Sequence, residues 1–136
     1  MTEELKALLE RQDKNIFAKY NHVEVESAEL DKVVYKLEIN PDCKNPLGFV
    51  HGGALYTMAD NAAGGAAHTD GRRYVTQTSS MYYLSNQSEG TIRATGRVIH
   101  RGRATCLVRV EVTGDNGKLL CMGEFTFFCL DSKKKD

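Results

Sequence analysis

The sequence predicts an α+β fold in which a long central helix is wrapped by a curved, mostly antiparallel sheet. Residues 52–68 place small and apolar residues at helical spacing, and residues 74–129 contain four long segments with period-two alternation. The order of elements agrees, because a helix and two strands precede the central helix and four strands follow it. Such grouping is typical of α+β rather than of alternating α/β proteins.

The first segment predicts an N-terminal helix over residues 2–19, with Thr2 as its cap. Its apolar stripe consists of Leu5, Leu8, Leu9, Ile16 and Phe17. Two strands follow, with alternating apolar residues at 23–25 and 33–39.

The central helix is expected to be buried. Leu55, Ala59, Ala62 and Ala66 lie on one helical face. Glycine weakens a helix by about 1 kcal/mol relative to alanine at an interior position. The glycines and alanines at 62–67 are therefore expected where another backbone approaches very closely.

The remaining chain reads as strands at 74–84, 91–99, 106–112 and 121–129. Asp115-Asn116-Gly117 predicts a hairpin turn, since Asn-Gly tolerates the positive φ angles of a type I′ turn. The tail at 132–136 is expected to be disordered. One sheet with one central helix leaves apolar surface uncovered, so self-association is expected.

Composition indicates one globular domain spanning residues 1–136. Hydrophobic residues make up 41% and charged residues 26%. Lys+Arg and Asp+Glu both number 18, which argues against a nucleic-acid partner bound over a broad basic surface. No apolar run could span a membrane, and the charged N-terminus lacks a signal-peptide core. A cytoplasmic protein is therefore expected.

The cysteines and histidines predict neither a metal site nor a cofactor. Cys43, Cys106, Cys121 and Cys129 show no CxxC and no paired zinc spacing. Buried free thiols in a reducing compartment are the better interpretation.

Two features suggest a reactive site at the start of the central helix. Gly52 and Gly53 expose backbone N–H groups, which the helix dipole helps to bind a developing negative charge. Asp60 lies inside the helix among small residues, where an unpaired carboxylate is costly. Together they suit acyl transfer. A tight Gly-Gly turn and an aspartate on a solvated helix face would give the same spacing, so spacing alone does not decide.

The pattern Asn45-x5-His51-Gly52-Gly53-x6-Asp60 resembles the motif of hotdog-fold thioesterases of the PaaI (phenylacetic-acid-degradation) type. The resemblance covers roughly residues 20–130. It implies an acyl-CoA thioesterase in which Asp60 is the nucleophile or general base and the Gly52 amide is the oxyanion donor.

The resemblance also implies roles for further residues. Asn45 and His51 would orient the thioester carbonyl and the loop, and Thr76, or alternatively Thr78, would place the water. Gly53 and the turn Arg101-Gly102-Arg103 would contact the acyl-CoA, the turn through the CoA phosphates. The family's Tyr-Leu-x-Pro is Tyr83-Leu84-Ser85-Asn86 here, which is expected to change the shape of that loop and not the chemistry.

The spacing of the site predicts at least a homodimer. Asp60 lies about 10 Å along the helix from Gly53, so a second chain would complete each site. The resemblance further implies a homotetramer. Two alternatives stay open: a hotdog dehydratase or hydratase, and a non-catalytic dimer that binds an acyl thioester or aromatic acid. The acyl group and its carrier, CoA or acyl carrier protein, also stay open.

Overall fold

The computed structural model describes residues 1–131, so the predicted disorder of the tail at 132–136 lies outside the described residues. The helices are α1 (Glu3–Gln12), α2 (Ile16–Tyr20) and α3 (Gly52–His68). The strands are β1 (Glu24–Glu29), β2 (Lys32–Glu38), β3 (Tyr74–Tyr83), β4 (Thr91–Arg101), β5 (Thr105–Thr113) and β6 (Leu119–Cys129). Short 3-10 turns occupy Pro41–Cys43 and Asp115–Gly117.

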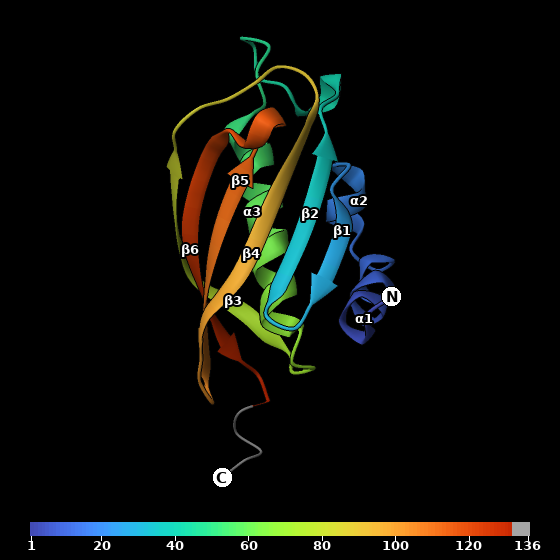
Figure 1. Cartoon of the computed structure of the whole chain (residues 1–136), viewed down its shortest axis with the longest axis vertical. Helices are drawn as coiled ribbons and strands as arrows, with labels where there is room; N and C mark the ends of the chain where they lie inside the picture. Colours follow the sequence, from blue (N-terminus) through green and yellow to red (C-terminus); the bar gives the residue numbers. More distant parts are fainter. Residues whose placement is uncertain (132–136) are drawn as a thin grey trace.

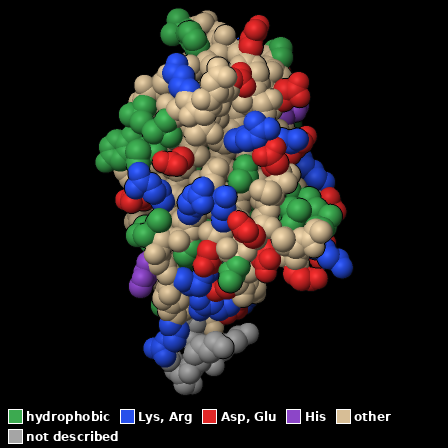
Figure 2. All heavy atoms as spheres, viewed as in Figure 1, with side chains coloured by type: hydrophobic (Ala, Val, Ile, Leu, Met, Phe, Trp, Pro, Cys, Tyr) green, Lys and Arg blue, Asp and Glu red, His purple; other side chains and the backbone are tan. Residues whose placement is uncertain are grey.

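The six strands form one antiparallel sheet in the order β1-β2-β4-β5-β6-β3, and α3 lies along its inner face (Figure 1). This is the predicted hotdog arrangement of a central helix wrapped by a sheet. Alternate residues of β2, β4, β5 and β6 point toward α3 and are buried, as the period-two pattern indicated. The outer face of the sheet carries interspersed basic and acidic side chains (Figure 2).

The backbones of α3 and β4 approach each other very closely in the core. A Cβ placed on Gly96 would stand 2.5 Å from the Ala62 carbonyl oxygen. Gly65 of α3, in contrast, faces side chains of β2 and α1 at ordinary or slightly tight distances. The close approach was therefore expected correctly, but the glycine that permits it lies on the strand rather than in the helix.

The predicted single N-terminal helix is instead two helices. α1 ends at Gln12, and the Asn15 side chain starts α2 by accepting a hydrogen bond from the Ala18 N–H. Thr2 caps α1 as expected, by accepting from the Leu5 N–H. The break also disrupts the predicted apolar stripe, because Leu8 is buried whereas Ile16 and Phe17 are exposed.

The Asn-Gly hairpin and the buried thiols agree with the sequence. Asn116 and Gly117 both adopt positive φ angles, of 64° and 73°. All four cysteines are free and buried. Within residues 1–131, no helix is long and apolar enough to cross a bilayer.

The β3 strand forms one edge of the sheet and is largely exposed, whereas α1 packs beside the opposite edge strand, β1 (Figure 1). Val75, Tyr82, Tyr83 and Leu84 are between 47% and 61% exposed. Hydrophobic side chains gather along this edge of the molecule in Figure 2. An unpaired edge with apolar residues is a surface suited to pairing with another strand.

We predict that Gly96→Ala destabilises the protein by about 1–3 kcal/mol, since the added methyl group overpacks a backbone contact. Gly64→Ala is the matched control on α3: its Cβ would meet only Phe127, at 3.9 Å, so helix propensity should raise stability by up to about 1 kcal/mol. Chemical denaturation measures both. Equal stability of the two variants would contradict the packing argument.

Candidate active site

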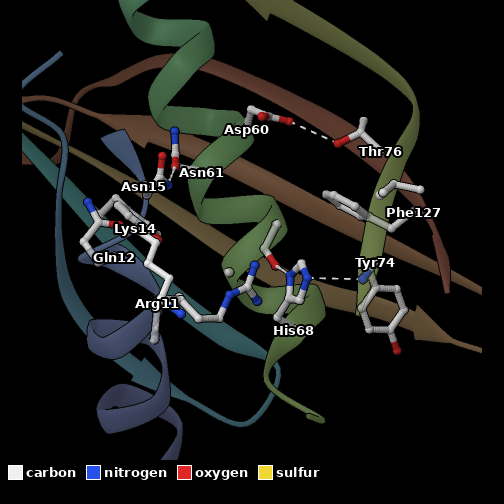
Figure 3. A pocket seen from close by; sticks show the side chains of 15 residues that line it. Arg11, Gln12, Lys14, Asn15, Asp60, Asn61, His68, Tyr74, Thr76 and Phe127 are labelled. Atoms are coloured by element: carbon white, nitrogen blue, oxygen red, sulfur yellow. Dashed lines mark hydrogen bonds between the residues drawn. The ribbon is translucent and has the colours of Figure 1, made fainter. Parts of the chain in front are cut away.

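Asp60 lies on the side of α3 that faces β3, where it meets Thr76 (Figure 3). The Thr76 hydroxyl donates to an Asp60 carboxylate oxygen at 3.4 Å. Thr78 instead bonds to Thr126. A bulge at Gln77 explains the difference, because the register with β6 shifts between the two threonines. The structure thus brings Thr76, rather than Thr78, to Asp60.

The Asp60 carboxylate is partly buried and lacks a cationic partner. Burial raises its pKa, and the hydrogen bond from Thr76 opposes that shift only in part. Among residues 1–131, no Lys, Arg or His lies within salt-bridge distance of it. A carboxylate with a raised pKa and little stabilisation of its charge is suited to accept a proton or to attack an electrophile.

The start of α3 presents one amide that is free to bind an oxyanion. His51 is the N-cap, and its Nδ1 accepts from the Gly53 N–H at 2.8 Å. The Gly53 amide is therefore occupied. The Gly52 N–H, in the first helical position, meets no acceptor among residues 1–131. Of the two glycine amides, the cap therefore leaves the Gly52 N–H without an acceptor in the described part of the chain.

Asn45 shapes the loop that leads into the helix. Its side-chain oxygen accepts from the backbone N–H groups of Leu47 and Phe49, which closes a tight turn. A residue outside the predicted set supports the same region: Asn86 donates from its side chain to the Val50 carbonyl at 2.9 Å. Asn86 stands where the family pattern has proline, and that departure was the signal that could have pointed to it.

The two halves of the site are far apart within one chain. Asp60 lies eight positions after Gly52 in α3, which corresponds to about 12 Å along the helix axis. One carbonyl group cannot contact both.

The structure gives Arg101 a role different from the expected phosphate contact. Its guanidinium turns inward and pairs with Asp31 at 2.7 Å and with Asp70 at 2.9 Å. It also donates to the backbone carbonyls of Ala66 and Ala67 at the end of α3. These acceptors occupy the donors that a phosphate would need, so Arg101 is a structural residue that closes the helix C-terminus.

The two residues that follow Arg101 in the turn make further contacts. The Gly102 amide donates to the Thr105 carbonyl, and Arg72 donates to the carbonyls of Gly102 and Arg103. Arg103 itself is exposed. Within residues 1–131, no cluster of His, Cys, Asp and Glu is arranged to hold a metal ion.

A cavity of about 520 Å³ opens beside Asp60 and runs along α3 (Figure 3). Its walls come from α3, from β3 and from the N-terminal segment, whose contribution the sequence did not predict. Asn15 anchors that segment by donating to the Asn61 side chain at 2.9 Å, one residue from Asp60. The size suits a small-molecule group.

Comparison with known proteins gives a family match over much of the chain. The family model described as "Thioesterase superfamily" matches residues 47–121. A curated relative, the 1,4-dihydroxy-2-naphthoyl-CoA hydrolase of Listeria monocytogenes, is 30% identical over 82% of this chain and 94% of its own length.

Solved structures agree in fold. A hypothetical thioesterase of Streptococcus pneumoniae with coenzyme A is 30% identical, with a TM-score of 0.75 over 79% of this chain and 88% of that one. The same protein was also solved with an aspartate or a threonine replaced by alanine. The Escherichia coli PaaI protein shares the fold, with a TM-score of 0.89 over 93% of both chains, at 20% identity.

We predict that Asp60→Asn raises the midpoint temperature of unfolding at neutral pH by a few degrees. Burial raises the pKa of Asp60, so the ionised wild-type carboxylate destabilises the fold above that pKa. The advantage of asparagine should shrink as the pH falls through the raised pKa toward the ordinary value of 3.8, because the wild-type group then becomes protonated. Thermal unfolding across pH measures this, and an advantage that grew in acid would contradict it.

Proposed function

Because the chain belongs to the thioesterase superfamily, we propose that it hydrolyses acyl-CoA thioesters with Asp60 as the catalytic carboxylate. The observation that carries the assignment is the environment of Asp60: a partly buried carboxylate without a cation, hydrogen-bonded by Thr76 and open to a cavity. As a thioester hydrolase, the protein needs such a group to activate water or to attack the carbonyl.

The pneumococcal thioesterase supports the assignment of Asp60 and Thr76 as a pair. The aspartate and the threonine replaced in that protein are sixteen positions apart. Asp60 and Thr76 have the same separation, and here their side chains are hydrogen-bonded.

In the proposed reaction, ionised Asp60 removes a proton from a water molecule held near Thr76, or attacks the thioester carbonyl directly. The carbonyl oxygen becomes negative and accepts a hydrogen bond from the Gly52 amide at the positive end of α3. His51 contributes by holding the Gly53 amide in the cap, and Asn45 by fixing the preceding turn. On the general-base route, the C–S bond then breaks and the CoA thiolate takes up the proton held by Asp60, which leaves the free acid. On the nucleophilic route, CoA leaves first, and water then hydrolyses the anhydride between the acyl group and Asp60 to release the acid.

We place each active site between two chains. The separation of about 12 Å along α3 prevents Asp60 from sharing a carbonyl with its own Gly52 amide. An antiparallel partner would supply the missing half, and the exposed apolar edge at β3 offers a surface for that pairing. The pairing of two dimers into a tetramer stays a prediction from the family resemblance.

The CoA phosphates are assigned to the exposed side chain of Arg103, at the turn between β4 and β5. Arginine suits a phosphate because its planar fork donates two parallel hydrogen bonds. Arg101 is left out of this assignment because its donors are used internally.

The dehydratase alternative is disfavoured by the histidines of α3. That chemistry needs an imidazole and a carboxylate at one carbon. His51 caps the helix, and His68 lies two turns beyond Asp60 with both ring nitrogens hydrogen-bonded.

We predict that Asp60→Asn lowers kcat by at least about 10²-fold on any acyl-CoA that the wild-type protein hydrolyses, since the proton acceptor or nucleophile is removed. Release of free thiol measures the rate. Asp13→Asn, which alters an exposed carboxylate on the surface, is the matched control and should keep wild-type activity. Near-normal turnover by a folded Asp60→Asn protein would exclude this role.

Shared sites predict that two inactive variants complement one another. Asp60→Asn and Asn45→Ala proteins are unfolded together and refolded, which forms mixed dimers with one doubly altered site and one intact site. Activity should recover partly in the mixture and not when either protein is refolded alone. Mixed dimers without activity would show that each chain holds a complete site.

A further inference from the structure

The cavity beside Asp60 changes character along its length. Near the carboxylate its walls combine Gly64, Val75 and Phe127 with the polar side chains of Asn61 and Thr76. The other end approaches His68, two turns further along α3, or about 12 Å from Asp60. Arg11 extends toward His68 at that end (Figure 3). The lining also includes the polar or basic side chains of Gln12, Lys14 and Tyr35.

Arg11 brings a positive charge to this end without an anion to neutralise it. No carboxylate among residues 1–131 lies within salt-bridge distance of its guanidinium. The Arg11 side chain is exposed to solvent, and partial desolvation lowers the pKa of its guanidinium. Lys14 adds a second cation that has no ion pair among these residues.

The surrounding groups do not supply a compensating negative charge. His68 donates from Nδ1 to the Gly64 carbonyl and accepts at Nε2 from the Tyr74 N–H, and burial lowers its pKa, so the ring is neutral. Burial raises the pKa of Tyr35 to about 12, so its phenol keeps its proton. The Tyr35 hydroxyl has no hydrogen-bond partner among residues 1–131 and is available as a donor.

We infer that this end of the cavity binds a carboxylate at the far end of the acyl group, through Arg11 and the Tyr35 hydroxyl. The substrate class is then CoA monothioesters of dicarboxylic acids, with an apolar spacer between the thioester at Asp60 and the distal acid. The inference rests on the proposed function and deepens it. Charge-assisted bonds from a guanidinium are the strongest polar contacts such a cavity can offer.

The test compares suberoyl-CoA with octanoyl-CoA, which have the same number of carbons and differ in the terminal carboxylate. We expect wild-type kcat/KM to be at least about 10-fold higher for suberoyl-CoA, because hydrogen bonds to charged groups contribute enough for that factor. Arg11→Met should remove most of this preference by lowering kcat/KM for suberoyl-CoA. Lys6→Met, on the same helix and outside the cavity, is the matched control and should retain the preference.

One result would overturn the inference directly. Gln12 has a buried side-chain oxygen that meets no partner within the described range 1–131, and this oxygen can accept from a hydroxylated ring. Faster turnover of 1,4-dihydroxy-2-naphthoyl-CoA than of suberoyl-CoA, unchanged by Arg11→Met, would assign the cavity to an uncharged ring. Equal wild-type rates on suberoyl-CoA and octanoyl-CoA would overturn it as well.

A measurement of binding without turnover tests this inference independently of the proposed hydrolysis. Calorimetry with the Asp60→Asn protein measures affinity for the two thioesters without turnover. An Arg11-dependent preference for suberoyl-CoA in binding, with no hydrolysis by the wild type, would support the cavity assignment and overturn the thioesterase role of Asp60. Hydrolysis of both thioesters by the wild type, with equal affinity of the Asp60→Asn protein for the two, would overturn the cavity assignment and support the proposed hydrolysis.

Discussion

The backbone contact between α3 and β4 is the constraint on which the remaining structure depends. Gly96 lets the Ala62 carbonyl approach the strand so closely that no side chain could intervene. The small residues of this helix face allow the sheet to wrap around α3, and they fix the rotation of the helix about its axis. With Ala59 and Ala62 buried against the sheet, Asp60 is left facing β3 and Thr76. The direction in which Asp60 points is thus set by the small residues on the helix face that packs against the sheet.

The end of α3 is fixed by a second interaction, made by Arg101, whose internal contacts differ from the phosphate contact predicted from the sequence. Arg101 bonds to the last carbonyls of the helix and to Asp70, and Asp70 accepts from the Tyr74 hydroxyl at the start of β3. Asp60 and Thr76 therefore belong to elements joined by one half-buried network. An arginine in a short turn between strands reads from sequence as a free surface cation, and only the fold shows that Asp31 and Asp70 meet it there.

Local patterns predicted the elements well because their physical causes are local. The helix at 52–68 has the predicted bounds, and the Asn-Gly turn adopts the positive φ angles that its residues favour. The prediction of one helix over residues 2–19 was wrong because a single side chain, that of Asn15, starts a new helix within this periodic segment. Choosing Thr76 over Thr78 required the bulge in β3, and such a register shift depends on the partner strand rather than on the sequence around it. The catalytic roles of the motif residues stay predictions, while the structure supplies the geometry that makes them testable.

The groups proposed for chemistry and those proposed for recognising the acyl group come from different segments of the chain. The Gly52 amide, Asp60 and Thr76 all lie within residues 47–121, the range matched by the family model. Arg11 and Tyr35, at the far end of the cavity, lie outside it. A family match over this range therefore supports the proposed reaction and gives no information about which acyl group the cavity binds. Because the N-terminal helices reach the site through side-chain contacts such as Asn15 to Asn61, substitutions there can change the cavity without moving the carboxylate. A shared reaction with different acyl groups is the expected outcome of such a division.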